Sequence, residues 1–254
     1  MEKLYDRADI YDLLQTEEKN RFVKEHWDMV LKGKHVHTLL DVSIGSGNLT
    51  LPLLDLGVNV SGSDLSEAML SRCAEKAKAK NASVDLRVSD FRNLSKHFTE
   101  QYDCVASTGN SLPYVTNDEI LSVLEQMDML VKPGGYLYFD LRNWDRILKT
   151  RQRFYLYNPV FVEDVRVNLV QAWDYNPDGT MDFNLLFTFE RNNRIVQKEV
   201  FQEHYHPVSQ QLLLDKLKSM GYTDMEITCM PAHGGAFDPE KHDWYCVMAN
   251  KSSK

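Results

Sequence analysis

The sequence has no long hydrophobic run and very little cysteine. No stretch approaches the roughly 20 apolar residues of a transmembrane helix, and the charged opening MEKLYDRADIYD holds no apolar run of signal-peptide length. The 4 cysteines, Cys73, Cys104, Cys229 and Cys246, are far apart and form no CxxC pair. This spacing favours free thiols in a reducing compartment over disulfides. We therefore expect a soluble, cytoplasmic protein without a membrane partner.

Positive charge is in the minority. The 254 residues include 29 Lys and Arg against 37 Asp and Glu, for a net charge of −8. This surplus of negative charge argues against polyanions as partners, so we expect no binding to nucleic acid. The chain is 43% hydrophobic, which is enough for one large core, and its length fits a single domain with an insertion.

Short strands alternate with helices through the first part of the chain. A helical segment is predicted over residues 1–33, and further helices over 48–57, 66–80 and 117–131. The predicted strands between them are 37–43, 58–64, 84–90, 102–108 and 136–141. Strands and helices that alternate at this spacing predict an α/β fold, with a parallel sheet covered by helices on both faces.

The pattern changes after Trp144. Residues 152–206 contain long alternating runs separated by the turn sequences NPDG and RNNR, which predict antiparallel hairpins. A helix and two strands then return to the α/β pattern. We therefore expect four regions: an N-terminal helical segment (1–33), an α/β core (34–150), an antiparallel β insertion (151–206) and the C-terminal part of the core sheet (207–254).

A glycine turn, LLDVSIGSGNLT, follows the first predicted strand and opens a helix. Gly45 and Gly47 lack a Cβ, so a ligand can lie against the backbone there. A dinucleotide-binding fingerprint needs a third glycine where Thr50 stands, and a P-loop needs a GK[ST] sequence that is missing. Asp41, just before the turn, would repel a pyrophosphate but attract a ligand with a cationic end. A tight turn without a ligand is the alternative.

Two further aspartates end the second and third predicted strands. Asp64 can accept both hydroxyls of a ribose, and Asp90 with Phe91 can bind the edge and the face of an adenine. Each aspartate alone could instead be a strand-end or helix-capping carboxylate. The three together favour an adenosine with a cationic amino-acid tail and no phosphates, which is S-adenosylmethionine (SAM).

The order of these motifs resembles that of the class I SAM-dependent methyltransferases over residues 35–141. Ser43 stands at the usual first glycine, and YDCVAS and VKPGGYLYFD follow as in that family. The resemblance implies a Rossmann-like fold whose seven-stranded, mostly parallel sheet has its last strand antiparallel. It also implies that the N-terminal helical segment (1–33) is a lid that covers the cofactor, with Arg21 near the cofactor carboxylate. The implied cofactor-binding residues are Tyr11 (or Tyr5), Arg21, Asp41, Ser43, Gly45, Gly47, Asp64, Leu65, Met69, Asp90, Phe91 and Ser107.

Two stretches resemble the glycine and sarcosine N-methyltransferases in particular. GNSLPYV (109–115) and DLRNWDRIL (140–148) are similar to that family's GNSFxHL and DxRNYDxIL, and the tail DWYCVMANK is similar too. The resemblance implies that Asn110 and Arg142 hold an amino-acid acceptor. Tyr114 stands where the family has histidine and Trp144 where it has tyrosine, which puts the identity of the amine in doubt more than the reaction.

The chemistry of methyl transfer agrees with this set. A guanidinium at a strand end can grip a carboxylate with two parallel hydrogen bonds, although an ion pair of Arg142 with Asp140 or Asp145 is the alternative. Asn110 or Tyr114 can orient the amine, and no compelling general base is evident. The catalytic residues predicted are Asn110, Tyr114 and Arg142. The aromatics Tyr155, Tyr157, Trp173 and Tyr205 could form a cage for a methylated ammonium, or simply pack the insertion.

We therefore expect a SAM-dependent N-methyltransferase for a small carboxylate-bearing amine such as glycine, sarcosine or dimethylglycine. An O- or N-methyltransferase for another small metabolite and a SAM-binding module without transfer activity stay open. A homo-oligomer stays open as well. No metal site is expected, because the calcium-like start at Asp174 has Leu185 where the twelfth-position glutamate should be.

Overall fold

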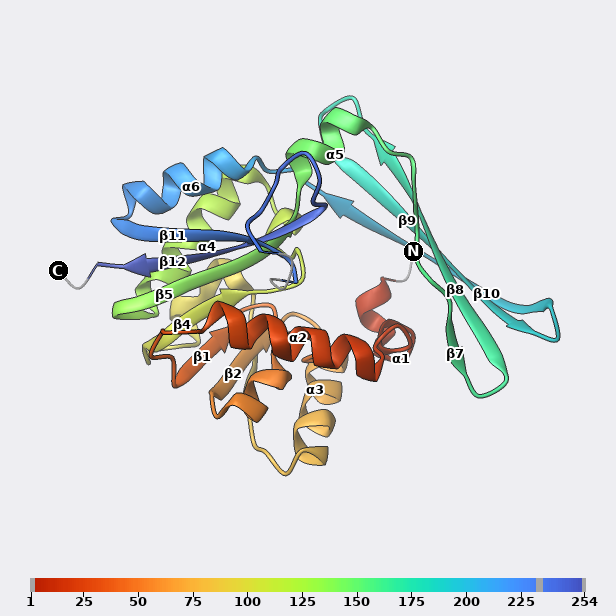
Figure 1. Cartoon of the computed structure of the whole chain (residues 1–254), viewed down its shortest axis with the longest axis horizontal. Helices are drawn as coiled ribbons and strands as arrows, with labels where there is room; N and C mark the ends of the chain where they lie inside the picture. The colour runs from red at the N-terminus through yellow and green to blue at the C-terminus, as the bar shows by residue number, and fades with distance from the viewer. Residues whose placement is uncertain (1–2, 232–234, 253–254) are drawn as a thin grey trace.

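The computed structural model describes residues 3–231 and 235–252, which form two β-sheets (Figure 1). In the larger sheet, five parallel strands are extended by an antiparallel pair, because β12 runs against both of its neighbours. The strand order is β11 (Tyr222–Cys229), β12 (Trp244–Lys251), β5 (Val131–Arg142), β4 (Tyr102–Ser107), β1 (Thr38–Asp41), β2 (Asn59–Asp64) and β3 (Asp85–Val88).

Helices cover both faces of this sheet and divide the apolar core in two. On one face α2 (Glu17–Val30) and α3 (Glu67–Ala79) bury residues such as Trp27 and Cys73. On the other face lie α4 (Asn117–Met129) and α6 (Gln210–Ser219). The remaining helical segments are η1 (Leu4–Asp6), α1 (Ala8–Asp12), η2 (Leu51–Leu56), η3 (Phe91–Lys96), η4 (Leu112–Tyr114) and α5 (Trp144–Thr150).

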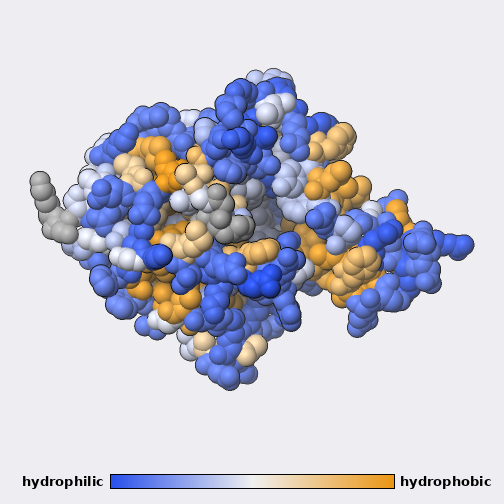
Figure 2. Space-filling view, in the orientation of Figure 1, coloured by the Kyte–Doolittle hydropathy of each residue, from blue (hydrophilic) through white to orange (hydrophobic). Residues whose placement is uncertain are grey.

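The smaller sheet is antiparallel and projects from the core after α5 (Figure 1). Its strands are β6 (Phe154–Leu156), β7 (Val160–Val162), β8 (Val165–Tyr175), β9 (Met181–Arg191) and β10 (Arg194–Tyr205). Alternate side chains of β8 and β9 are buried and join the core on the α4 side. Hydrophobic residues also gather on the exposed surface of this sheet, among them Phe154, Leu156 and Phe161 (Figure 2).

The α/β sheet and its antiparallel insertion confirm the fold predicted from the sequence. The helix predicted over 48–57 is a 3₁₀ segment, η2, which ends at Gly57 in the left-handed region. All four cysteines lie within the described residues and are buried free thiols, as predicted. Of the described helices, none has both the length and the hydrophobicity to cross a membrane.

Candidate active site

The glycine turn after β1 leaves a surface open for a ligand. Gly45 and Gly47 have φ angles of +54° and +81°. A Cβ on Gly47 would lie 2.6 Å from Leu51, whereas a Cβ on Gly45 would meet no protein atom within 4 Å. Packing therefore requires a glycine at position 47. Gly45 instead presents backbone without a side chain to the open space beside it.

Asp41 stabilises the turn from inside. Its side chain is fully buried and accepts hydrogen bonds from Ser43 N at 3.0 Å, from Thr108 Oγ1 at 2.7 Å and from the Thr50 hydroxyl. Its oxygens are occupied by these hydrogen bonds and buried, and its direct contact with a cationic ligand stays a prediction. Thr50 is equally informative, since its hydroxyl bonds the aspartate where a dinucleotide fingerprint would have glycine.

Asp64 at the end of β2 connects the turn to the neighbouring strand. Its Oδ2 accepts a hydrogen bond from Gly45 N and its Oδ1 one from Ser66 N, both at 2.9 Å. Burial raises the pKa of this carboxyl above its usual value. Each oxygen keeps a lone pair, so the carboxylate can still accept from ribose hydroxyls.

The other predicted adenosine contacts differ in their exposure. Asp90 caps η3 and pairs with Arg92 at 2.6 Å, and this hydrogen bond lowers the pKa of the carboxyl. Leu65 is 63% exposed beside Asp64, whereas Phe91 is only 8% exposed. Met69 has no exposed surface at all. It lies on the buried face of α3 and supports the site from the core. Its contact with the cofactor stays a prediction.

The opening segment bridges the core and the insertion (Figure 1). At one end Leu4 N donates to Glu203 Oε1 on β10 at 3.2 Å, and at the other Asp12 pairs with Lys76 on α3 at 2.7 Å. Tyr11 lies between these anchors. Burial, followed by the charges of Asp12 and Asp64, raises the pKa of its hydroxyl. This arrangement suits the predicted cover over the cofactor.

Arg21 is not brought to the strand ends. Its side chain is 64% exposed and lies 3.9 Å from Glu25 on the same helix. It borders a surface cleft that also includes Gly47 and Asn48. Its pairing with the cofactor carboxylate stays a prediction.

Asn110 links the ends of β4 and β5. Its backbone has a positive φ of 60°, and its Oδ1 accepts hydrogen bonds from Arg142 N at 3.0 Å and from Trp144 Nε1 at 3.1 Å. Both acceptor positions of the amide are thus used. Its buried Nδ2 has no partner among the described residues. The free group of Asn110 is a donor, so it suits a carboxylate better than the amine that we expected it to orient.

Arg142 is a buried cation surrounded by aromatic rings. It is 5% exposed, and its guanidinium carbon lies 4.9–5.5 Å from four ring centroids, those of Trp244, Trp173, Tyr155 and Phe183. Its Nη2 donates weakly to Tyr157 Oη at 3.2 Å and to Gln171 Oε1 at 3.4 Å. Among the residues that the structure describes, Nη1 has no partner and no carboxylate pairs with the guanidinium. The ion pair with Asp140 or Asp145 that the sequence left open does not form.

The hydroxyls of three tyrosines form one hydrogen-bonded group. Tyr114 Oη hydrogen-bonds with Tyr5 Oη at 3.0 Å and with Tyr205 Oη at 2.7 Å. Burial raises the pKa of Tyr114 well above its usual value, so the three phenols stay neutral. The tyrosines thereby join the lid, the β4 loop and the insertion around the acceptor end of the site.

Ser107 and Ser43 close the space between β1 and β4. Their hydroxyls are 3.1 Å apart, and Ser43 Oγ also donates to Thr108 O at 3.1 Å. Ser107 is 1% exposed. It therefore fixes the floor of the site and offers a ligand almost no surface of its own.

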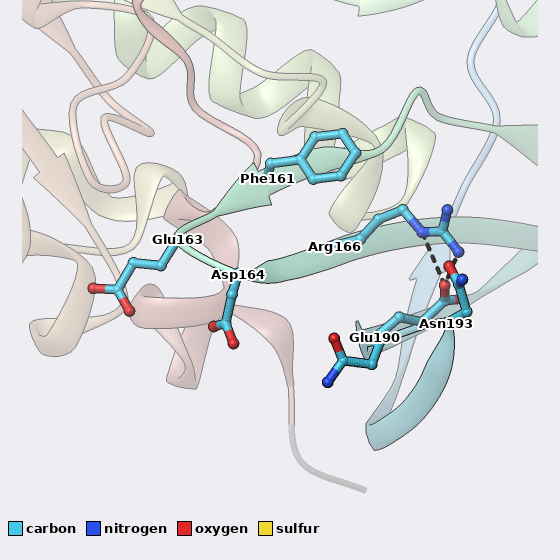
Figure 3. Close-up of a pocket in the computed structure, with 7 residues that line it drawn as sticks. Phe161, Glu163, Asp164, Arg166, Glu190 and Asn193 are labelled. Atoms are coloured by element: carbon cyan, nitrogen blue, oxygen red, sulfur yellow. Dashed lines mark hydrogen bonds and ion pairs between the residues drawn. The ribbon is translucent and has the colours of Figure 1, made fainter.

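A separate small pocket lies at the far tip of the insertion (Figure 3). Phe161, Asp164 and an Arg166–Glu190 ion pair line it. Arg166 is seven residues along β8 from Trp173, a separation of about 23 Å in an extended strand. This pocket is therefore remote from Arg142, and its arginine is already paired with Glu190.

Comparison with known proteins agrees with this geometry. A family profile described as a methyltransferase domain matches residues 39–135, the part that holds the glycine turn and the strand ends. The chain is 25% identical to a glycine/sarcosine N-methyltransferase of Aphanothece halophytica over 232 residues, 89% of this chain and 81% of that one. It is 28% identical to a ubiquinone biosynthesis O-methyltransferase of Coxiella burnetii over 76% of this chain and 77% of that one.

A SAM-dependent methyltransferase from Clostridium acetobutylicum has the same fold along nearly the whole chain. The TM-score is 0.75 at 17% identity, covering 96% of this chain and 97% of that one. The chain is a class I SAM-dependent methyltransferase. The sequence prediction of family, enzyme class and cofactor is therefore confirmed.

The described residues of this methyltransferase fit SAM. The bare backbone at Gly45 leaves room for the ligand, and Asp64 retains lone pairs for the ribose. SAM supplies an electrophilic methyl group on a sulfonium. Asn110 and Arg142 place buried polar groups at the neighbouring ends of β4 and β5.

Sequence reasoning missed two buried carboxyls of this site. Glu203, 4% exposed, lies on β10, far along the chain from the glycine turn. Asp140 was considered only as an ion-pair partner of Arg142. It is 1% exposed, and its Oδ2 has no partner within residues 3–231 and 235–252. The available signal for Asp140 was its position, two residues before Arg142 on the same strand.

Replacing Gly45 by alanine tests the bare backbone of the turn. We expect SAM binding to weaken about 10- to 100-fold, because the new Cβ occupies ligand space, while stability falls by only ~1–2 kcal/mol from the left-handed backbone. Gly179→Ala is the matched control, since Gly179 also has positive φ (+86°) with open space around it but lies in the β8–β9 turn. Calorimetric titration with SAM should separate the two variants. Equal SAM affinities would contradict the assignment of Gly45.

Proposed function

We propose that this methyltransferase transfers a methyl group from SAM to the nitrogen of a small amine that carries a carboxylate. Glycine, sarcosine and dimethylglycine are the leading acceptors. The observation that carries this proposal is Arg142, a buried guanidinium whose Nη1 has no partner and which forms no ion pair with a carboxylate among the described residues.

A buried cation without a counterion is costly. Aromatic rings offset part of the loss of hydration, each worth about 0.5–2 kcal/mol, but several kcal/mol remain for a fully desolvated charge. A substrate carboxylate would offset the remainder, since a guanidinium and a carboxylate form short, parallel hydrogen bonds. The unpartnered Nδ2 of Asn110 would add a third donor to the same anion.

Methyl transfer requires alignment more than new charge stabilisation. Positive charge moves from sulfur to nitrogen, and the amine lone pair must lie behind the S–methyl bond. Holding two reactants in such a geometry is worth up to ~7–11 kcal/mol. A carboxylate fixed by Arg142 and Asn110 would set the position of the amine, and the ring of Tyr114 would limit its freedom.

A second acceptor class, a hydroxyl of a small metabolite, is favoured by one observation. The O-methyltransferase relative matches this chain at 28% identity, slightly above the 25% of the glycine/sarcosine enzyme. A neutral hydroxyl acceptor, however, would leave the guanidinium of Arg142 without an anion. The carboxylate-bearing amine therefore remains the first candidate.

The test is transfer of labelled methyl from SAM to a panel of acceptors. The panel contains glycine, sarcosine and dimethylglycine, carboxylate-free amines of similar size, and small phenols. We expect turnover of at least one amino acid and none of the carboxylate-free amines. Turnover of phenols alone, with SAM bound normally, would support the second class and overturn the first.

A further inference from the structure

We propose that Asp140 is the general base that removes a proton from the acceptor amine before methyl transfer. The inference rests on the proposed function, since it concerns an acceptor that arrives as an ammonium. Nothing in the family comparison assigns a role to this residue. Its evidence lies in the position of the carboxyl, in its hydrogen bonds and in the groups that surround it.

Asp140 shares β5 with Arg142 and contacts the loop that carries Asn110. It is two residues before Arg142 on β5, so the two side chains leave the same face of the strand. Its Oδ1 accepts a hydrogen bond from Gly109 N at 3.0 Å, and its backbone oxygen accepts one from Asn110 N at 3.2 Å. These bonds attach the carboxyl to the loop that carries Asn110.

Three buried polar atoms at these strand ends have no partner among the described residues: Asn110 Nδ2, Asp140 Oδ2 and Arg142 Nη1. Two of them are donors and one is an acceptor. A zwitterionic amino acid offers the complementary set, namely a carboxylate for the two donors and an ammonium for the acceptor. Because an unpartnered buried group costs about 1–3 kcal/mol, three together indicate a ligand rather than a packing accident.

The proton balance of the step is simple. The ammonium N–H bond breaks, the proton moves to Asp140 Oδ2, and the bonding pair stays on nitrogen as its lone pair. That lone pair then forms the N–C bond while the S–C bond of SAM breaks and its electrons stay on sulfur. The carboxylic acid later returns its proton to solvent when the product leaves.

The surroundings of Asp140 suit a base that works near neutral pH. Burial, followed by the charge of Asp41, raises the pKa of Asp140 to about 7. A base is most effective when its pKa lies near the working pH. The cation on the same face of β5 is Arg142, two residues further along the strand.

The other titratable groups around Asp140 come from several elements. Tyr138 lies on the same strand, Cys246 on β12 and Tyr11 on α1, and burial raises the pKa of all three, that of Cys246 to about 12. His26 of α2 hydrogen-bonds with Tyr138 Oη at 2.9 Å, which connects it to this cluster. The tyrosines and the cysteine therefore stay neutral in the range where Asp140 titrates.

Glu203 is the rival carboxyl. Burial raises its pKa as well, but it accepts a hydrogen bond from Leu4 N at 3.2 Å. This partner belongs to the lid. We therefore assign Glu203 to anchoring the lid and Asp140 to the proton.

The experiment is the pH profile of kcat/KM for the best amino-acid acceptor, in wild type, Asp140→Asn and Glu203→Gln. Wild type should lose activity below about pH 7 as Asp140 becomes protonated. Asp140→Asn should be about 10²- to 10⁴-fold slower at pH 7 with unchanged SAM affinity. Its deficit should shrink roughly tenfold per pH unit above that, because the free amine then forms without a base. Glu203→Gln should keep the inflection near pH 7.

Asp103→Asn is the matched control. Asp103 also lies on a central strand, but at the opposite end of β4, where it pairs with Lys132 at 2.7 Å. The variant should retain the wild-type profile.

Three results would overturn the inference. The first is an Asp140→Asn profile parallel to wild type, and the second is loss of the inflection in Glu203→Gln instead. The third is an Asp140→Asn variant whose only defect is weaker SAM binding, which would show that this carboxyl binds the amino group of the cofactor. In all three the proposed function survives. If wild type methylates no amino acid at any pH, the proposed function is wrong, and this inference is then wrong as well.

Discussion

Arg142→Ala should lower kcat/KM for the amino-acid acceptor about 30- to 4,000-fold, which corresponds to ~2–5 kcal/mol. The acceptor KM should rise while kcat changes little, because a guanidinium that binds a carboxylate stabilises the bound substrate and the transition state alike. Arg142→Lys should recover only part of the loss, since an ammonium keeps the charge but not the planar fork. Steady-state kinetics with each substrate varied in turn measures both effects.

The arginine series needs a control for packing, because four aromatic rings surround the guanidinium. Arg166→Ala removes an arginine from the same antiparallel sheet, where it pairs with Glu190 far from the site, and should leave kcat/KM unchanged. SAM affinity should be the same in all of these variants. A fall in SAM affinity with the acceptor KM unchanged would show that Arg142 supports the fold of the site and does not bind the acceptor.

Asp140→Asn should stabilise the protein above pH 7 by up to about 4 kcal/mol while it slows the reaction. The folded state raises the pKa of this carboxyl from 3.8 to about 7, so it holds its proton more tightly than the unfolded chain does. The free energy of unfolding therefore decreases as pH rises from about 4 to about 7. Above that range the buried carboxylate lowers it by the full amount. The gain of the asparagine variant should be largest at pH 8 and near zero at pH 4.

Urea unfolding of Asp140→Asn and Asp103→Asn at several pH values measures this effect. Asp103 has the opposite shift, since its hydrogen bonds with Lys132 and with two backbone amides outweigh desolvation and lower its pKa to about 2. Asp103→Asn should therefore destabilise the protein at neutral pH. If Asp140→Asn is destabilising at pH 8 as well, the carboxylate is satisfied in the folded state and the account of its burial is wrong. A residue that reduces stability yet stays ionisable is typical of a functional site.

Local patterns made most of the fold predictable. Strands alternating with helices produced the parallel sheet, and the alternating runs around NPDG and RNNR produced the hairpins of β8, β9 and β10. The glycine turn and Asp64 could be placed because a motif fixes their relation within one βα unit. The exchange of helix for 3₁₀ at η2 could not be predicted, because both have nearly the same side-chain spacing.

Contacts between distant segments could not be predicted from the sequence. Trp173 was recognised as an aromatic residue of the insertion, but nothing local indicates that it and Phe183 face Arg142. The sequence also does not show which buried aspartates have all their hydrogen bonds. Asp41 is saturated with hydrogen bonds, whereas Asp140 is not. Tertiary packing decides both, so the acceptor end was the less complete part of the sequence prediction.

The most direct test of the account compares the best amino-acid acceptor with its own carboxamide in the wild-type enzyme. The two differ only in the group that Arg142 would bind, and the carboxamide has the more readily deprotonated amine, so chemistry alone favours it. The account predicts kcat/KM about 10²-fold or more higher for the amino acid, since a buried charge pair is worth at least ~2–3 kcal/mol. Equal values, or a preference for the carboxamide, would contradict the claim that this site recognises a carboxylate.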